Sequence, residues 1–422
     1  MNKKFISILS LVSLLFLSAC GISSVSVSQI GECEQLNEDY SYFRANITSE
    51  EFNNSYNRFA ANISEIANES DNNSCISPLS VYSALSMLSF STSGNTQSEI
   101  LKYLNTNEED LKNNYSKLFI SSNYYDDDIE DFRETLFNSI WIQNDFEYKK
   151  EGVDNVSKNA YADIFKIDFT NKYAGKYISN YVKDKTHKLI NPELNIDSST
   201  QMALVNTLYL NDPWFRFGDD LGLTKTKIDF KNSDNTITND YFMIKSTSGK
   251  AYSNSDVRVM CVSTYSRYKL TFIVPNDNKK INDVFNEKNI NEAINANFYD
   301  YDQDKYIYET INKFPKFSAE SKYDLVEDLK NKGIKDVFSS NADFSPISNS
   351  DLSCSQVLHF TKLGVDRKGI IGAAMTYVAM DGASGPDERI KVTEEFIVDK
   401  AFGYLISDSF NRILFSGIIN KI

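Results

Sequence analysis

The sequence predicts an α+β fold with a deeply buried β-sheet, and three stretches indicate it. Residues 202–214 form a nearly continuous apolar run, which is typical of a strand buried on both faces. Residues 78–88 carry apolar side chains at helical spacing and begin with a proline, which suits the first turn of a helix. Residues 369–376 are small or apolar, uncharged and free of proline, so they too can enter the middle of a sheet.

The composition is that of a folded, acidic protein. Of the 422 residues, 41% are hydrophobic and 24% are charged, which is a globular rather than a disordered composition. The length allows one domain of roughly 400 residues or two smaller ones. The formal net charge of -14 argues against a nucleic-acid partner and against electrostatic attachment to anionic lipid.

Residues 1–19 have the features of a signal peptide for export. Two lysines precede an apolar core at residues 5–17, which is too short to span a bilayer comfortably. The Leu-Ser-Ala-Cys sequence at residues 17–20 has the form of a bacterial lipobox, with Cys20 at the cleavage point. The alternative is a plain secretory signal with an incidental cysteine, but the position of Cys20 favours lipidation. Acyl chains on Cys20 would hold the protein on the surface of a bacterial membrane.

Residues 20–48 are polar and are predicted to be a tether between the lipid anchor and a folded domain. Ser49 is predicted to cap the first helix of that domain. Alternating runs at residues 136–143 and 359–365 each predict a strand. Residues 257–275 predict two strands joined as a hairpin, with its turn at Ser266 and Arg267. Residues 381–395 contain glycine, proline and charged residues, which predict a long solvated loop.

The cysteines and histidines form no recognisable catalytic or metal-binding pattern. Apart from Cys20, the cysteines are too far apart for a CxxC motif; they are Cys33, Cys75, Cys261 and Cys354. A disulfide is permitted outside the cytoplasm, whereas the apolar surroundings of Cys75 and Cys261 favour buried free thiols. The two histidines are His187 and His359, which makes a histidine zinc site or a hydrolase triad improbable. We expect no metal, no cofactor and no enzymatic activity.

Residues 359–402 resemble the reactive-centre loop region of the serpins. In that family a strand leads to a hinge that begins at a glycine and continues with small residues, and the cleaved loop inserts into a large central sheet. Here Gly369 matches the hinge glycine. The residues in the place of the small-residue run are Ile370, Ile371, Gly372, Ala373, Ala374 and Met375. Residues 396–402 and 413–417 resemble the family's segment after the loop and its last strand.

Motifs in the family's order extend this resemblance over roughly residues 49–420. Ser77 and Ser80 match hydroxyl positions of the "shutter", a polar region beneath the central sheet where it opens. Asn206 matches the shutter asparagine and Trp214 the tryptophan of the "breach", where the loop enters the sheet. His359 is grouped with these residues. Simple structural roles are the alternatives, with Ser77 as a helix cap and Asn206 as a hydrogen-bonded core residue.

The hinge departs from the family pattern at several positions. Arg367 and Lys368 stand where inhibitory relatives usually carry acidic residues, and isoleucines replace the usual Thr and Glu. Gly372 lowers the strand propensity of the segment, but no charge or proline interrupts it. Lys313 stands where inhibitory relatives often carry a shutter histidine, so we expect that polar cluster to be altered.

The resemblance implies a single serpin-like α+β domain at residues 49–422. It would have a large central, mostly antiparallel sheet, smaller sheets, about eight or nine helices and an exposed reactive-centre loop at about residues 369–395. The implied function is suicide inhibition of serine endopeptidases, with cysteine proteases as a further target class. A protease forms an acyl-enzyme with the loop, and the freed hinge then becomes a new strand; serpin loop insertion is itself a standard example of strand addition.

The family's spacing from the hinge glycine places the scissile bond between Ala383 and Ser384. A small residue before the bond suggests an elastase-like or subtilisin-like target. Met380 is the second choice. Arg389, a trypsin-type site, is the third because it lies too far along the loop. The alternative function is a non-inhibitory surface binding protein whose loop is a substrate or an adhesive segment. In both cases we expect a monomer whose membrane contact is the lipid on Cys20.

Overall fold

The computed structural model describes residues 25–33, 47–69, 71–125, 133–186, 188, 190–215, 219–370 and 389–422. The predicted signal peptide and Cys20 lie outside these residues, as does His187. So do most of the predicted hinge and the first two choices of scissile bond, namely Ile371, Gly372, Ala373, Ala374, Met375, Met380, Ala383 and Ser384.

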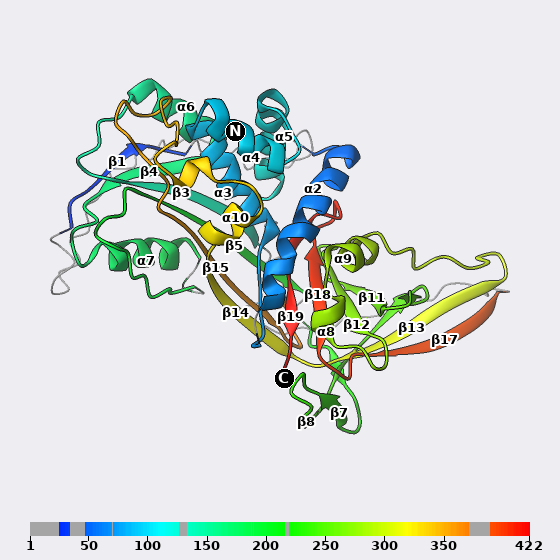
Figure 1. Cartoon of the computed structure of the whole chain (residues 1–422). Coiled ribbons are helices and arrows are strands. Elements are labelled where there is room, and N and C mark those ends of the chain that lie inside the picture. The colour runs from blue at the N-terminus through cyan, green and yellow to red at the C-terminus, as the bar shows by residue number, and fades with distance from the viewer. Residues whose placement is uncertain are drawn as a thin grey trace, which may run out of the picture.

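An eight-stranded mixed sheet forms the centre of the molecule, with the order β1-β4-β3-β5-β16-β15-β14 and with β2 paired to β3 (Figure 1). Its strands are β1 (Val27–Gly31), β2 (Tyr124–Tyr125), β3 (Arg133–Gln143), β4 (Ala162–Ile167), β5 (Met202–Pro213), β14 (Phe317–Asp324), β15 (Gln356–Val365) and β16 (Gly369–Ile370). Most neighbours are antiparallel, while β3–β4 and β5–β15 are parallel. The predicted α+β fold with a large, mostly antiparallel central sheet is confirmed.

Three smaller sheets accompany it in the described part of the chain. The five-stranded sheet has the order β10 (Tyr252–Ser253), β11 (Val257–Ser263), β12 (Lys269–Pro275), β18 (Phe402–Ser407) and β19 (Ile413–Ile419). The four-stranded sheet has the order β17 (Ile390–Ile397), β13 (Tyr306–Phe314), β9 (Met243–Ser248) and β6 (Gly222–Leu223). The last sheet pairs β7 (Ile228–Lys231) with β8 (Ile237–Asp240).

Nine α-helices are found in the described residues, in agreement with the prediction. They are α2 (Glu50–Ser64), α3 (Pro78–Ser91), α4 (Gly94–Tyr103), α5 (Glu108–Ser121), α6 (Lys150–Ala160), α7 (Ala174–Lys185), α8 (Ile281–Val284), α9 (Glu287–Ile294) and α10 (Val326–Asn331). The same segments contain the short 3-10 helices Glu65–Glu69 and Asp336–Phe338. Ser49 caps α2 as predicted, because its hydroxyl accepts the N–H of Phe52 at 3.2 Å.

β5 lies between two layers, which explains its unbroken apolar sequence. On one face Ala203 and Val205 pack in a cluster with Ile178 of α7. On the other face Leu204 and Leu208 belong to the main core, together with α3. α3 is itself buried along its whole length, so an apolar surface on every side suits it. The strand prediction for residues 202–214 is therefore confirmed to within a residue.

Residues 27–31 differ from the prediction of a polar tether. They form β1, which pairs antiparallel with β4 at the edge of the central sheet. Val27 and Ile30 are only partly buried, and each packs against a different core cluster. The sequence pattern missed this strand because an edge strand is held mainly by main-chain hydrogen bonds and needs few apolar side chains.

The cysteines of the described segments are free thiols. Cys75 is buried as predicted, whereas Cys261 is only half-buried. Within the residues that the structure describes, no group of three potential ligands is arranged to hold a metal ion. Those same segments contain no helix whose length and apolar character would let it cross a membrane.

Candidate functional site

The central sheet is only partly closed between β5 and β15. These parallel strands pair directly over four positions, from Ala203–Gln356 to Asn206–His359. Beyond that point, no pairing in the described part of the chain joins them until β16, which lies between their far ends. Residues 207–211 of β5 therefore border a gap in the ladder, with β16 at one end of it and the Asn206–His359 pair at the other.

The predicted hinge glycine is already inside the sheet. Gly369 pairs with Pro213, and Ile370 pairs with Asp212 of β5 and with Val365 of β15. A Cβ atom on Gly369 would lie 2.3 Å from the carbonyl oxygen of Asp212, so only glycine fits at this approach. Ile370 is fully buried. The first two residues of the predicted hinge thus form a short strand that is antiparallel to both of its neighbours.

Trp214 holds the turn that leads into the hinge, at the predicted breach. Its indole N–H donates to the carbonyl oxygen of Asp366 at 2.7 Å, and its main-chain N–H donates to the carbonyl oxygen of Lys368 at 2.9 Å. The amine of Lys245 lies 5.8 Å from the centre of the indole ring, and burial lowers the pKa of that amine. Trp214 therefore joins the end of β5 to the turn before Gly369.

The unusual basic residue Arg367 has an acidic partner nearby. Its guanidinium lies 3.2 Å from Asp220 and donates to the carbonyl oxygen of Leu221 at 2.9 Å. In return, the N–H of Leu221 donates to the carbonyl oxygen of Arg367 at 2.7 Å. Arg367, which departs from the family pattern, is thus bound by Asp220 and Leu221. These contacts hold the turn that precedes Gly369.

His359 and Ser77, two of the predicted shutter residues, meet beneath the sheet. The N–H of Ser77 donates to Nε2 of His359 at 3.0 Å, while the Ser77 hydroxyl accepts the N–H of Ser80 at 3.2 Å as the cap of α3. Burial lowers the pKa of His359 to about 3, which keeps the imidazole neutral and able to accept this bond. The Ser80 hydroxyl makes no hydrogen bond within the described residues.

The expectation that Lys313 replaces the shutter histidine is wrong. Lys313 lies in β13 of another sheet, where its amine is 2.6 Å from Glu395. The histidine beneath the gap is His359, because the alternation along β15 turns its side chain toward the first turn of α3. The polar cluster beneath the gap therefore retains its histidine.

Asn206 is buried and belongs to a separate polar network. Its side-chain amide donates to Asn138 of β3. Asn138 in turn donates to the hydroxyl of Tyr115 at 2.7 Å and accepts from the hydroxyl of Ser83 at 2.9 Å. Asn138, Ser83 and Tyr115 were not predicted as site residues from the sequence. A signal for Ser83 exists, since it continues the three-residue spacing of Ser77 and Ser80 along α3.

Arg389 lies at the far end of the loop, directly before β17. Its guanidinium donates to the carbonyl oxygen of Gln303 at 3.2 Å. The N–H of the following Ile390 donates to the carbonyl oxygen of Lys305 at 2.9 Å, and β17 then runs parallel to β13. The two ends of the loop are thus attached to different sheets.

A family model described as "Serpin (serine protease inhibitor)" matches residues 54–422. The chain belongs to the serpin family. Iripin-1 of Ixodes ricinus is 27% identical over 388 residues, which cover 85% of this serpin and 92% of that protein. Serpin A3-6 of Bos taurus is 30% identical over 324 residues, which cover 74% of this serpin and 75% of that protein.

Solved structures agree with the family assignment at the level of the fold. The thermophilic serpin tengpin in its native state superposes with a TM-score of 0.74 at 24% identity, and the match covers 93% of this serpin and 97% of that chain. The central sheet, with its gap between β5 and β15 and with β16 at one end of that gap, is therefore part of a serpin fold. Membership of this family supports protease inhibition as the general function.

Proposed function

We propose that this serpin is a suicide inhibitor of serine endopeptidases that inserts its cleaved reactive-centre loop into the gap between β5 and β15. One observation carries the proposal. The first two residues of the hinge, Gly369 and Ile370, already occupy the sheet at one end of that gap, in the orientation that an inserted strand needs. Because β5 and β15 are parallel to each other, a strand inserted between them is antiparallel to both in only one direction. β16 already runs in that direction.

The register of β16 predicts where the rest of the loop would lie. Ile370 pairs with Asp212 on one side and with Val365 on the other. In an antiparallel strand, Thr376 lies six positions after Ile370. It would therefore pair with the residues six positions before those partners, which are Asn206 and His359. The two registers therefore converge on the pair at which β5 and β15 first meet. An inserted strand would place Thr376 between these two residues, and it would have to separate them to extend further.

The composition of the loop suits both faces of such a strand. Alternate residues from Ile370 onward would face the main core, beside Leu208 and Leu210; they are Gly372, Ala374, Thr376, Val378 and Met380. The others would face the layer of α7; they are Ile371, Ala373, Met375, Tyr377 and Ala379. None of them is charged. Each new main-chain hydrogen bond would contribute roughly 0.5–1.5 kcal/mol before the cost of ordering the strand.

We propose Ala383–Ser384 as the bond that the protease attacks. The catalytic serine would add to the carbonyl carbon of Ala383 and expel the amine of Ser384, leaving an ester between the enzyme and Ala383. In the same register Met380 would lie opposite Met202, at the start of β5, so this bond falls just beyond the inserted strand. Insertion would then carry the esterified protease along and distort it before water releases it. Arg389 is disfavoured because it lies directly before β17 and is held there by its bond to the carbonyl oxygen of Gln303.

We further propose that the protein is exported and held on a bacterial membrane by lipid on Cys20, and that it acts there as a monomer. The lipobox-like sequence at residues 17–20 supports lipidation. Six residues separate Cys20 from Val27 of β1, and seven Cα steps span at most about 25 Å. A lipid at Cys20 would therefore keep the β1 edge of the central sheet close to the membrane.

Incubation of the purified protein with elastase, subtilisin and trypsin tests the proposed function. We expect an SDS-stable one-to-one complex with an elastase-like or subtilisin-like enzyme, and a released peptide that begins at Ser384. The nicked protein should melt at a higher temperature than the uncut one. Clean cleavage without a complex, combined with an unchanged melting temperature, would favour the alternative of a non-inhibitory binding protein.

A further inference from the structure

A single turn of the five-stranded sheet holds two buried carboxyl groups of the central sheet. The turn joins β11 to β12 and spans residues 264–268, where the N–H of Thr264 donates to the carbonyl oxygen of Tyr268 at 2.9 Å. The carboxyl groups belong to Glu134 of β3 and Asp212 of β5, which are adjacent strands on the same side of the gap.

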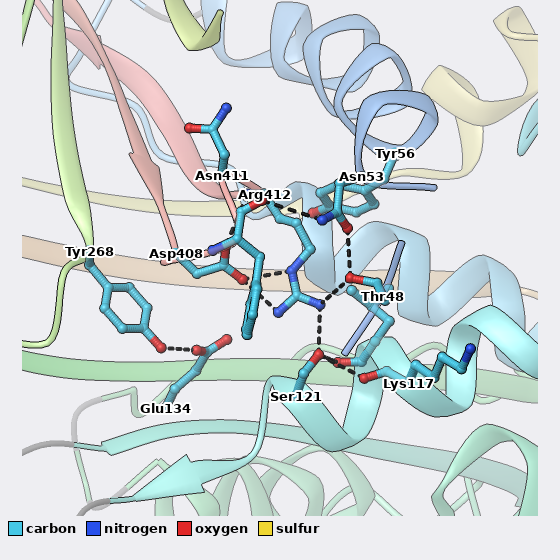
Figure 2. Close-up of polar contacts among 12 residues, drawn as sticks. Thr48, Asn53, Tyr56, Lys117, Ser121, Glu134, Tyr268, Asp408, Asn411 and Arg412 are labelled. Carbon is cyan, nitrogen blue, oxygen red and sulfur yellow. Dashed lines mark hydrogen bonds and ion pairs between the residues drawn. The ribbon is translucent and has the colours of Figure 1, made fainter. Parts of the chain in front are cut away.

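Glu134 is buried, and Figure 2 shows its side chain facing Tyr268. The phenol of Tyr268 donates to one carboxyl oxygen of Glu134. Burial, with a further contribution from the charge of Asp408, raises the pKa of Glu134 to about 8 from its ordinary value of 4.5. The bond from Tyr268 and the charge of Arg412 act in the opposite direction.

Asp212 is also fully buried, at the position where it pairs with Ile370. Its carboxyl oxygens accept the hydroxyl of Thr264 and, at 3.4 Å, the N–H of Ser266. The main chain adds a third link, since the N–H of Tyr265 donates to the carbonyl oxygen of Pro213 at 2.9 Å. Burial raises the pKa of Asp212 to about 7 from its ordinary value of 3.8.

The charges around Glu134 are themselves neutralised. Arg412 is buried, and its guanidinium lies 2.5 Å from Asp408, so these two residues form a closed ion pair (Figure 2). A second guanidinium nitrogen donates to the hydroxyl of Ser121 at 2.7 Å. Tyr56, packed close by, has a pKa raised well above its ordinary value by burial and stays neutral. The positive charge of Arg412 is already paired with Asp408, so an ionised Glu134 would add a second negative charge to this buried site.

The turn is attached to the opposite side of the gap through its own sheet. Phe317 of β14 packs its ring 5.4 Å from the ring of Phe402 and 5.4 Å from that of Tyr404, both in β18. β18 pairs with β12, which carries the turn. A new strand needs about 4.8 Å of width, so insertion would shift β3 and β5 relative to β14, β15 and this turn.

We infer that Glu134 and Asp212 clamp the β3–β5 side of the central sheet to the 264–268 turn, and that ionisation of these carboxyl groups favours opening of the sheet, because it leaves negative charge buried away from water. The part of this inference that concerns loop insertion rests on the proposed function. Because folding raises the pKa of both carboxyl groups, the stability they contribute is fully present below their ordinary values of 3.8 and 4.5. It is lost as the pH rises from there to about 7 for Asp212 and about 8 for Glu134. The closed sheet is therefore held more firmly at pH 6 than at pH 9.

The rate of unfolding of the uncut, full-length protein in a fixed concentration of urea tests the clamp. We expect the wild-type unfolding rate to rise about tenfold or more between pH 6 and pH 9. A tenfold change is the effect of one carboxyl group whose pKa falls by about one unit when the sheet opens. Glu134→Gln and Asp212→Asn keep the shape but cannot ionise. Each should unfold more slowly than the wild type at pH 9, and the double variant should show a flat profile. Glu109→Gln, at an exposed glutamate of α5, makes the same change of charge and should keep the wild-type profile.

Tyr268→Phe provides a test that retains both carboxyl groups. Loss of the phenol removes a bond that lowers the pKa of Glu134, so the rise in unfolding rate should move to higher pH. A flat wild-type profile, or a double variant with the wild-type profile, would overturn the clamp. A nicked protein that melts no higher than the uncut one would overturn the proposed function. The dependence of the unfolding rate of the uncut protein on pH would still test whether Glu134 and Asp212 form the clamp.

Discussion

Asn206 of β5 and His359 of β15 form the last directly paired position before the gap in the central sheet. Both side chains are buried, and each is tied to a group outside its own strand. Asn206 donates to Asn138 of β3, and His359 accepts the N–H of Ser77 at 3.0 Å. Separating β5 from β15 at this position therefore requires that polar contacts beneath the sheet shift or break.

Replacing His359 with alanine should destabilise the uncut protein by about 1–3 kcal/mol, because the buried N–H of Ser77 loses its acceptor. His359→Gln should cost less, since an amide oxygen can accept the same bond. Equilibrium unfolding in urea at neutral pH measures both losses. Equal effects of the two variants would show that the hydrogen bond is not the important contribution.

His359 should also make the protein sensitive to acid. Burial lowers its pKa to about 3 from the ordinary value of 6.5, so the unfolded chain takes up the proton first. The stability contributed by the neutral imidazole is therefore present above pH 6.5 and is lost as the pH falls toward 3. The unfolding free energy of the wild type should therefore fall relative to that of His359→Gln as the pH drops through this window. Parallel profiles would contradict the prediction, and the comparison cancels the titration of all other groups.

Gly369→Ala should displace β16 from the sheet. The added Cβ would lie 2.3 Å from the carbonyl oxygen of Asp212 and 2.8 Å from Cα of Pro213, which are backbone atoms of a buried strand. Overpacking of this kind costs about 1–3 kcal/mol. Thermal unfolding of the uncut protein measures the loss. Gly222→Ala is the matched control, because nothing lies within 4 Å of a Cβ atom at that position, and it should leave stability unchanged.

Thr376→Arg should convert the protein from an inhibitor into a substrate. The register of β16 would bury this residue between Asn206 and His359, where an unpaired charge is strongly unfavourable. Cleavage should proceed, but the SDS-stable complex and the gain in thermal stability should be lost. Asp387→Arg places the same charge beyond the predicted strand and should retain complex formation. Complex formation by Thr376→Arg would contradict the proposed register.

Cys20→Ser should release the protein from the membrane fraction of a bacterium that expresses it. The hydroxyl of serine cannot accept the thioether-linked diacylglyceryl group that anchors a lipoprotein. Fractionation and mass spectrometry of the N-terminus measure the change. Cys33→Ser is the control and should remain in the membrane fraction. An unmodified N-terminus in the wild type would support the simpler secretory signal.

The sequence predicts well those parts of the site that depend on local patterns. The apolar run of β5 indicates burial on both faces, and the proline and serine at the start of α3 indicate its cap. Asn206 could be singled out because a polar side chain within an apolar strand needs a partner. Its actual partner, Asn138, could not be named, since the two residues are 68 positions apart and meet only through the pairing of β3 with β5.

The sequence by itself determined the serpin-like order of motifs, the uncharged hinge after Gly369 and the faces that must be buried, because these follow from spacing and residue size. The tertiary structure alone decided that β1 joins the sheet, that His359 accepts a bond from Ser77 while Lys313 lies in another sheet, and that Glu134 and Asp212 share one turn. Glu134 and Tyr268 are 134 residues apart in the chain. Their interaction matters because folding removes water from both, and no local pattern records which distant group will replace that water.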